Sequence, residues 1–588
     1  MEKLITRWGK ELNQDSPLQE YPRPQMVRES YTNLNGLWDY AILPKSQKLG
    51  KYQGKIVVPF SPETILSGVE KNVTEKDFLY YQKKFNFKKT KDIVLLHFGA
   101  VDYECEVSLN GKLVGKHKGG YYPFYFDITK NIINGENKIT LRVSDPSDKG
   151  EQARGKQKKH KGGIWYTPQS GIWQTVWIEE VVNNFIDRIK ITPNIDDDTV
   201  AIEPIFKNEF IPYQVIISDN GTQIVKKMCK DKVAIIKLED YNLWSPENPY
   251  LYDLEIFAGD DQVVSYFGMR KFGIGYDSKG ITRMTLNNKP YFQNGLLDQG
   301  YWSDGLYTAP SDDAMIYDIA TMKEMGFNML RKHIKLEPLR WYYHCDKFGM
   351  IVWQDMISGG SNYSNLTIGL KPFLGLCTFN KKIGHMNDGK KNYRKFSRND
   401  DQGRKEYYVD SQRLIDTLYN TVSLGLWVPF NEGWGQFDSL KACEFYRKQD
   451  PTRVIDHASG WHDQGGGDIN SFHIYFTKYK FPKFDKNDDR AIAVTEFGGF
   501  SFQIKGHVYN ENKFFGYRKF YNREAFATAY EKLFVNEIIG NIPKGLSASV
   551  YTEVSDVEDE ANGLLSFDRE VVKIDMDLIK QINEKVRL

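Results

Sequence analysis

GLWVPFNEGWG, residues 425–435, and AIAVTEFGG, residues 491–499, are the two stretches that decide the fold of the C-terminal half of this chain. Each is an almost wholly apolar run that ends in a glutamate, Glu432 or Glu496. A glycine follows each glutamate within two residues and lets a ligand approach the backbone. Barrels of parallel strands present catalytic groups at such strand ends. The two stretches therefore predict a parallel barrel that brings two glutamates to one site.

The same unit recurs throughout residues 276–588. Apolar runs alternate with helical segments, among them a helix that Ser311 caps, with Asp312 and Asp313 in its first turn. Eight such runs predict a (β/α)8 TIM barrel. The predicted strands are PYFQNGLL (290–297), FNMLRKHI (327–334), GMIVWQD (349–355), GLWVPF (425–430), RVIDHAS (453–459), INSFHIY (469–475), AIAVTEF (491–497) and LSASVY (546–551). Residues 358–404, rich in Gly, Asn, Lys and Asp, are predicted to form a long loop on the catalytic face.

The first 275 residues show the pattern of short β-strands instead. DIVLLHFGAVDYECEVSLNGKLVG, from residue 92, alternates apolar and polar positions and turns at Asn110-Gly111, a type I′ hairpin signal. Residues 1–181 are therefore predicted to form an all-β jelly roll. Residues 182–275 add strands such as YQVIISD and LYDLEIF, in a length that suits an immunoglobulin-like sandwich. The predicted fold is thus a jelly roll, a β-sandwich and a TIM barrel in one chain.

The composition excludes several classes of function. The 79 basic and 77 acidic residues almost cancel, so no global field favours nucleic acid or an anionic membrane. No apolar stretch approaches the ~20 residues that span a bilayer. The first 25 residues are polar and broken by proline, which predicts a cytoplasmic location. The five cysteines are scattered, which fits reduced thiols there: Cys105, Cys229, Cys345, Cys377 and Cys443.

The polar residues that end the predicted strands are the candidate site residues. They are Arg331, His333, Asp355, Asn431, Glu432, His473, Tyr475 and Glu496. Retaining glycoside hydrolysis needs a carboxylic acid and a carboxylate ~5–5.5 Å apart. Glu432 and Glu496 end strands on opposite sides of a small barrel, so they can meet at that distance. An acid that faces an ionised carboxylate stays protonated, whereas one that accepts hydrogen bonds, from Tyr475 or Arg331, stays ionised.

Other conspicuous residues are interpreted as structural. His473 taken alone fits a core histidine, and four tryptophans taken alone fit packing positions: Trp302, Trp353, Trp434 and Trp461. The basic run RGKQKKHKGG, residues 154–163, is interpreted as a mobile, solvated loop rather than an anion site. No recognised ligand spacing joins His457, His462 and Asp463. No metal and no other cofactor is predicted.

The whole chain resembles glycoside hydrolase family 2, which contains β-galactosidases, β-glucuronidases and β-mannosidases. The segments that carry the resemblance are NLNGLWDY (33–40), SGIWQTVWIEE (170–180), LWSPENPYLYDLEI (243–256), FGMRKFGI (267–274), NGLLDQGYW (294–302), Asn431-Glu432 and TEFGG (495–499). The resemblance implies a jelly-roll sugar-binding domain, an immunoglobulin-like domain and a catalytic barrel, the same three parts as the strand rhythm predicts.

The resemblance also implies roles for individual residues. Glu432 matches the acid/base, Glu496 the nucleophile, and Asn431 the residue that binds the sugar 2-hydroxyl. Arg331 and His333 look like the strand-two pair of the family, and Tyr475 looks like the tyrosine that positions the nucleophile. Three further positions are implied as sugar contacts: Asp298 and Trp302 after strand one, and Tyr551 on strand eight. The Asn-x-Lys element that reads the carboxylate of glucuronides has no convincing counterpart after Glu496, because NIPK at Asn541 has the wrong spacing.

The leading hypothesis is a retaining exo-β-glycosidase that acts on short oligosaccharides or on aryl or alkyl glycosides. The order of preference is β-galactoside before β-glucoside and β-glucuronide, because a uronate needs a fixed cation and the Asn-x-Lys element is absent. Arg154 or Lys156 in RGKQ is the alternative source of that charge. Transglycosylation by the same carboxylates stays open, as does a homo-oligomer. The hypothesis of another class is a non-catalytic carbohydrate-binding protein.

Overall fold

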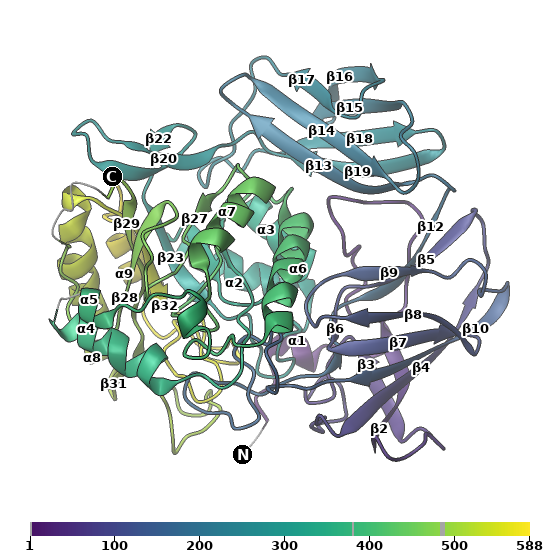
Figure 1. The fold of residues 1–588 in the computed structure, drawn as a ribbon, viewed down its shortest axis with the longest axis horizontal. Coiled ribbons are helices and arrows are strands. Elements are labelled where there is room, and N and C mark those ends of the chain that lie inside the picture. The colour runs from purple at the N-terminus through teal and green to yellow at the C-terminus, as the bar shows by residue number, and fades with distance from the viewer. Residues whose placement is uncertain (1–2, 379–380, 483–487) are drawn as a thin grey trace.

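The chain folds into two β-domains beside a larger α/β domain (Figure 1). The structure is a computed structural model that describes residues 3–378, 381–482 and 488–588. The short helix α1 (Arg7–Lys10) precedes the first strand. No helix within the described ranges is long and apolar enough to cross a membrane.

The first β-domain consists of two antiparallel sheets that pack face to face, and it confirms the predicted jelly roll. The sheets have the orders β1-β12-β5-β9 and β3-β2-β4-β10-β7-β8, and β11 pairs with β6. Asn110 and Gly111 join β7 to β8 with positive φ angles of 51° and 80°, as a type I′ turn requires. The strands are β1 (Thr32–Asn33), β2 (Gly36–Pro44), β3 (Gly54–Val58), β4 (Asp77–Phe87), β5 (Ile93–Phe98), β6 (Val101–Asp102), β7 (Glu104–Leu109), β8 (Lys112–Lys118), β9 (Phe124–Asp127), β10 (Gly135–Ser144), β11 (Gly171–Ile172) and β12 (Val176–Val181).

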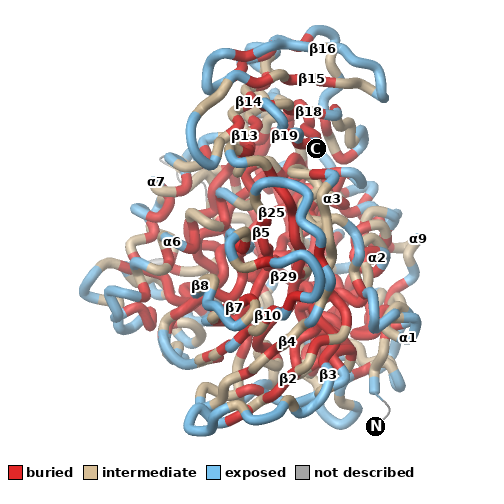
Figure 2. The backbone as a smooth tube through the Cα atoms, turned by 90° about the vertical axis from the view of Figure 1, so that its right-hand side faces the viewer, coloured by how far each residue is buried: buried red, intermediate tan, exposed pale blue. Residues whose placement is uncertain are grey.

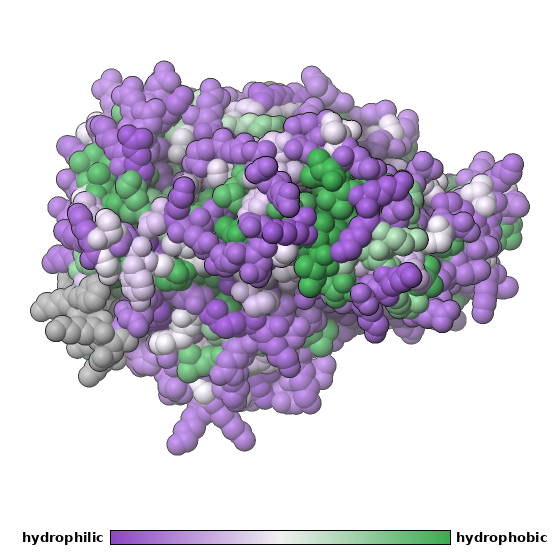
Figure 3. All heavy atoms as spheres, turned by 90° about the horizontal axis from the view of Figure 1, so that it is seen from above, coloured by the Kyte–Doolittle hydropathy of each residue, from purple (hydrophilic) through white to green (hydrophobic). Residues whose placement is uncertain are grey.

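The second β-domain is a sandwich of a three-stranded sheet, β13-β14-β17, and a four-stranded sheet, β16-β15-β18-β19. The strands are β13 (Ile186–Asn194), β14 (Thr199–Phe206), β15 (Tyr213–Asp219), β16 (Thr222–Cys229), β17 (Ala234–Lys237), β18 (Tyr252–Ala258) and β19 (Asp261–Phe267). Alternate residues of β15 face the shared core, whereas the edge strand β16 is largely exposed (Figure 2). A hydrophobic strip marks this end of the molecule (Figure 3), where Ile224, Met228 and Ile235 are exposed.

The third domain is a parallel eight-stranded barrel with the order β27-β26-β25-β24-β23-β32-β29-β28. All eight predicted strands are present: β23 (Gln293–Asp298), β24 (Met329–Lys332), β25 (Ile351–Asp355), β26 (Leu424–Val428), β27 (Val454–Ile455), β28 (Ile469–Ile474), β29 (Ala491–Gly498) and β32 (Leu546–Thr552). At the seam between β27 and β28, the Asp468 N–H donates to the Ile455 carbonyl at 2.8 Å. The predicted TIM barrel is confirmed.

Helices lie around the outside of the barrel (Figure 1). They are α2 (Asp312–Glu324), α3 (Leu339–Phe348), α4 (Lys371–Thr378), α5 (Lys381–Gly384), α6 (Asp401–Leu418), α7 (Ser439–Gln449), α8 (Arg523–Leu533) and α9 (Met576–Asn583). Ser311 caps α2 as predicted, because its side chain accepts a hydrogen bond from the Ala314 N–H. The short strands β30 (Phe500–Phe502) and β31 (Arg518–Phe520) pair with each other beyond β29.

The barrel strands are buried on both faces. Leu297 and Trp353 belong to a cluster inside the barrel, whereas Leu330 and Val352 belong to a second cluster that includes residues of α2 and other helices. The inner cluster is closed by Met284 of the small sheet β20 (Phe272–Tyr276), β21 (Thr282–Leu286) and β22 (Lys289–Pro290). Apolar packing therefore fills the barrel floor, and the opposite end, where the strands finish, is left to polar side chains.

Residues 358–404 differ from the predicted plain loop. The segment contains α4 and α5, and its last residues begin α6. Its bias toward Gly, Asn and Lys obscured the short apolar stretch KPFLGLCT, which forms α4.

Candidate active site

The carboxyl ends of the barrel strands bring together the eight polar residues that end the predicted strands. These residues are Arg331 of β24 and His333 just after it, Asp355 of β25, Asn431 and Glu432 after β26, His473 of β28 and Tyr475 just after it, and Glu496 of β29. All but Tyr475 are less than a tenth exposed. Every second side chain of a strand points into the barrel. Trp353 points inward near the floor, so later residues on the same face of the strands also point inward and form one polar layer.

Glu432 occupies a strained backbone position and is set up as an acid. Its φ of 50° lies in the left-handed region that few non-glycine residues use. Its N–H donates to the Ser459 carbonyl at 3.0 Å, and its Oε1 lies 2.8 Å from Nδ1 of His473. Burial raises the pKa of Glu432 to about 7, against the opposing charges of Lys156 and Arg331. Its proton is therefore available near neutral pH.

Glu496 has the environment of an ionised carboxylate. The Tyr475 hydroxyl donates to its Oε2 at 2.5 Å, and Nη1 of Arg331 lies 3.2 Å from its Oε1. Charge-assisted contacts of this kind favour the anionic form. The two glutamates thus differ in surroundings as two carboxyl groups with different roles should.

His473 lies between the two carboxylates. Its Nδ1 is 2.8 Å from Oε1 of Glu432 and 3.5 Å from Oε2 of Glu496, and one donor atom of each of the three residues lies within 4.8 Å of the other two. Burial lowers the pKa of His473 to about 4, so the ring is neutral at pH 7. These donor atoms lie close enough together to coordinate a cation. The Arg331 guanidinium already supplies positive charge to Glu496, and this favours a carboxylate pair over a metal centre.

Arg331 organises the remaining residues. Its Nε and Nη2 donate to the two oxygens of Asp355 at 2.9 Å and 3.2 Å, a bidentate pair that fixes the plane of the guanidinium. Nη2 also donates to Oδ1 of Asn431 at 2.9 Å. This contact orients the Asn431 amide so that its Nδ2, which has no hydrogen-bond partner within the described residues, is available to a ligand. Asp355 also contacts Nδ1 of His333 at 2.7 Å.

The jelly roll reaches into the mouth of the barrel, contrary to the expectation of a solvated loop at residues 154–163. Arg154 donates to the carbonyls of Gly360 and Ser361 just beyond β25, and the Gly155 N–H donates to the Ser358 carbonyl at 2.9 Å. Arg154 and Lys156 are both buried. The charge-rich composition of the run concealed these contacts because their partners are about 200 residues away in sequence, a separation at which local patterns carry no information.

Aromatic side chains from five segments line the rim. Trp165 of the jelly roll lies 5.1 Å from Trp434, which follows Glu432 by two residues, and Tyr363 lies within 6.0 Å of both rings. Tyr517 stacks on Tyr475 at 3.8 Å with an interplanar angle of 10°. Trp165 and Tyr517 were not predicted, since no local pattern distinguishes them from packing residues.

The segment 358–404 contributes to this rim in part. Tyr363 belongs to the aromatic group, and the His462 ring contacts the Thr367 carbonyl at 2.9 Å. Phe373 of α4 lies 5.6 Å from Phe476, which itself lies 5.2 Å from Tyr517. Phe379, a further aromatic residue of this segment, lies outside the described residues.

Three residues implied as sugar contacts lie elsewhere. Asp298 faces outward from β23 and accepts a hydrogen bond from Lys332 at 2.7 Å. Trp302 packs against Trp8 at 6.0 Å, with the Arg569 guanidinium 4.2 Å from its ring. Tyr551 is fully buried among the rings on the helix side of β32. The reason for Asp298 and Tyr551 is strand parity: their neighbours Leu297 and Val550 take the inward positions.

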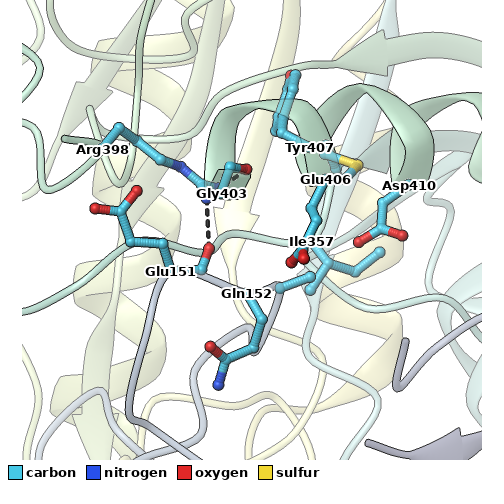
Figure 4. Close-up of a pocket in the computed structure, with 10 residues that line it drawn as sticks. Glu151, Gln152, Ile357, Arg398, Gly403, Glu406, Tyr407 and Asp410 are labelled. Atoms are coloured by element: carbon cyan, nitrogen blue, oxygen red, sulfur yellow. Dashed lines mark hydrogen bonds between the residues drawn. The ribbon is translucent and has the colours of Figure 1, made fainter. Parts of the chain in front are cut away.

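A small cavity, about large enough for one water, lies at the junction of the jelly roll and α6 (Figure 4). Arg398 crosses it and donates to the backbone carbonyl of Glu151, while Glu406 and Asp410 approach from α6. Its lining includes neither Glu432 nor Glu496. The cavity is a feature of the interdomain packing and separate from the carboxylate pair.

Three segments of the chain match known protein families. Residues 53–175 match the family described as "Glycosyl hydrolase 2 galactose-binding domain-like", and residues 184–270 match "Glycosyl hydrolases family 2". Residues 279–584 match "Glycosyl hydrolases family 2, TIM barrel domain". The matches follow the three domains of the structure in order.

Individual proteins are similar at low identity. A "Putative beta-glucuronidase" of Formosa agariphila is 28% identical over 297 residues, 47% of this chain and 34% of that protein. A "Beta-galactosidase" of Thermoanaerobacter pseudethanolicus is 25% identical over 321 residues, 50% of this chain and 42% of that protein. The chain therefore spans less than half the length of these two relatives. A "Beta-glucuronidase" of Streptococcus agalactiae is 23% identical over 545 residues, 81% of this chain and 84% of that protein.

Solved structures share the whole architecture. A beta-glucuronidase of an uncultured Clostridium sp. superposes with a TM-score of 0.75 at 17% identity, covering 95% of this chain and 99% of that one. A GH2 beta-galacturonidase from Eisenbergiella tayi bound to galacturonate superposes with a TM-score of 0.69 at 16% identity, covering 96% and 99%. At such identities the likeness establishes the fold alone.

Proposed function

Because the chain belongs to glycoside hydrolase family 2, we propose that it is a retaining β-glycosidase that removes the terminal sugar from the non-reducing end of its substrate. The observation that carries the proposal is the pair Glu432 and Glu496. Their nearest carboxylate oxygens lie within 4.8 Å of each other, and their surroundings favour a protonated and an ionised group, respectively. Retaining enzymes hold their two carboxyl groups ~5–5.5 Å apart.

In the first step, Glu496 forms a bond to the anomeric carbon while the bond to the leaving oxygen breaks. Glu432 transfers its proton to that oxygen, so the aglycone departs as a neutral alcohol. Tyr475 and Arg331 each contact one oxygen of Glu496, and together they fix the orientation of the carboxylate that attacks. The Nδ2 donor of Asn431 is oriented by Arg331 to bind the sugar 2-hydroxyl, where hydrogen bonds strengthen in the transition state.

In the second step, water replaces the glutamate. Glu432, now ionised, takes a proton from a water molecule whose oxygen bonds to the anomeric carbon as the bond to Glu496 breaks. The sugar leaves with its original β-configuration, and both carboxyl groups regain their starting forms. A sugar hydroxyl in place of water would give transglycosylation by the same route.

For the sugar, we propose a neutral β-hexoside, with β-galactoside as the first substrate to test. The support is the charge at the mouth: Lys156 is the cation that the jelly roll brings there, and Oε2 of Glu560 already lies 3.9 Å from its Nζ. A uronate would compete with Glu560 for that one ammonium group. The names of the relatives, beta-galactosidase and beta-glucuronidase, make β-glucuronide the competing substrate.

The test is a panel of p-nitrophenyl β-glycosides, with the first-formed anomer of the released sugar identified by proton NMR. We expect turnover of at least one substrate, with the β-anomer appearing first. Release of the α-anomer would exclude the double displacement. An absence of turnover on the whole panel, together with measurable sugar binding, would instead support the non-catalytic carbohydrate-binding alternative.

A further inference from the structure

A second pair of buried carboxylates lies in the loop that follows the last barrel strand. Glu553 comes directly after β32 and is fully buried, and Glu560 is 1% exposed. The Glu553 Oε2 accepts a hydrogen bond from the Gln299 amide at 2.8 Å, while its Oε1 accepts none from the described residues. Glu560 accepts hydrogen bonds from the Tyr166 hydroxyl and, at 2.9 Å, from the Asn562 amide.

This pair is linked to the catalytic pair through two tyrosines. Tyr475, which holds Glu496, also lies 3.0 Å from Oγ1 of Thr552, the residue before Glu553. Tyr517, stacked on Tyr475, feels the charges of both pairs: its pKa is raised by burial and then by Glu432, Glu560, Glu496 and Glu553. Tyr475 and Tyr517 therefore connect the loop that carries the second pair to the catalytic pair.

The second pair is short of positive charge. Among the described residues, Lys156 is the one cation within 4.0 Å of either carboxylate, at 3.9 Å from Glu560, and Glu553 has none. Burial raises the pKa of Glu553, and the neighbouring Glu560 raises it further. Buried carboxylates are costly unless donors satisfy their oxygens. The free Oε1 of Glu553 therefore marks a place for a hydrogen-bond donor from outside the chain.

We propose that Glu553, Glu560 and Lys156 form a specificity pocket that binds adjacent hydroxyl groups of the terminal sugar and rejects a sugar carboxylate at the same place. Two hydroxyl groups supply donors to the carboxylates and accept from the ammonium group, a match that a uronate cannot make. The inference rests on the proposed function and adds to it the residues that select the sugar. It also assigns one of those residues to the jelly roll.

The choice of hydroxyl over carboxylate follows from the charge balance. A uronate would bring a further carboxylate to a place where the Lys156 ammonium is already paired with Glu560 and where Glu553 has no cation within 4.0 Å among the described residues. Like charges in a buried site repel strongly, because little solvent screens them. A neutral hexose adds no charge and brings the missing donors.

The experiment compares matched neutral and uronate substrates in isosteric variants. For Glu553→Gln and Glu560→Gln, kcat and KM are measured on the p-nitrophenyl β-hexoside that the wild type cleaves best and on the corresponding β-hexuronide. We expect kcat/KM for the neutral sugar to fall at least ~10-fold, mainly through KM, as loss of a hydrogen bond to a charged group predicts. The ratio of neutral to uronate kcat/KM should shift toward the uronate by a similar factor.

Glu558→Gln is the matched control. Glu558 lies in the same loop, is 6% exposed, and its carboxylate is held by the side chains of Thr167 and Lys161. Its substitution should leave the ratio of neutral to uronate kcat/KM unchanged, because the loss of its contacts with the jelly roll would affect the binding of both sugars alike. Melting temperatures of all three variants separate a folding defect from a binding defect. Unchanged KM and unchanged ratio in both test variants would overturn the proposal.

A second measurement uses the wild-type protein and so does not depend on any variant folding. The free neutral hexose and the corresponding free hexuronate are compared as competitive inhibitors. We expect the hexose to bind at least ~10-fold more tightly. Equal or tighter inhibition by the hexuronate would overturn the proposed specificity pocket, even if Glu432 and Glu496 prove catalytic. If no glycoside is cleaved, the proposed function fails. Failure of the pocket alone differs from this, because glycosides are then still cleaved.

Discussion

Replacement of Glu432 by glutamine should lower activity most at low pH, where the wild-type carboxyl is protonated. It should raise stability at high pH, where the wild-type carboxyl is charged. In the wild type, kcat/KM for a substrate with a poor leaving group should fall about tenfold per pH unit above about 7, where burial places the pKa of Glu432. The variant should lack this decline. Its activity on that substrate should be lower by about 10²–10⁴, the usual contribution of a general acid.

The stability effect follows from the same proton. A carboxyl whose pKa rises from 4.5 to about 7 on folding binds its proton more tightly in the folded chain. Its contribution is full below about pH 4.5 and is lost as the pH rises through 7. The difference between the two pKa values corresponds to about 3 kcal/mol of unfolding free energy that is lost at high pH. Glutamine has no charge to desolvate, so the variant should be more stable than the wild type at about pH 8, with the advantage gone at about pH 4.

The assays are pH profiles of kcat/KM on phenyl and 2,4-dinitrophenyl β-glycosides and melting temperatures at the same pH values. Glu63→Gln is the control, because burial raises the pKa of Glu63 to about 8 in the jelly roll, away from the site. It should reproduce the pH-dependent gain in stability with no kinetic change. A basic limb that persists in the Glu432 variant, or one that lies below about pH 5.5 in the wild type, would refute the assignment.

Three further outcomes are expected. Glu496→Ala should lose several orders of magnitude in turnover, and azide should restore part of it with an α-glycosyl azide as product; a β-azide would exchange the roles of the two glutamates. Asp298→Asn should lower the melting temperature, because buried Lys332 loses one of its two carboxylate partners, while KM stays unchanged; a raised KM would return Asp298 to the site. Replacing residues 366–384 by a tight turn should raise KM for short substrates more than it lowers stability. Kinetics identical to those of the wild type would show that the segment takes no part in substrate binding.

The barrel and its polar layer could be predicted from the sequence because each strand ends its apolar run in a polar residue. The facing of individual strand residues could not. In GLLDQG, Leu296 and Leu297 are both apolar because both faces of a parallel barrel strand are buried, so the pattern does not say whether Leu297 or Asp298 points inward. Tyr551 was implied as a sugar contact by the family resemblance, and the strand pattern could not correct this, because it does not say that Val550 takes the inward position.

Other parts of the site depend on long-range contacts. Lys156 joins the mouth only because the jelly roll docks against the barrel, and a charged run by itself looks solvated. Glu553 directly follows the eighth strand and so fits the strand-end pattern, but it was not among the candidates predicted from the sequence. Glu560 lies in a turn beyond it and carries no local signal.

The docking of Arg154 and Lys156 into the barrel mouth has a thermodynamic consequence. A ligand that touches residues of both domains binds only the docked arrangement, so its binding energy adds to the energy that holds the domains together. Occupancy should then delay separation of the jelly roll from the barrel, and proteolysis of residues 146–163 should slow as sugar concentration rises. By reciprocity, any change that loosens the junction should weaken sugar binding without altering a single group that contacts the sugar.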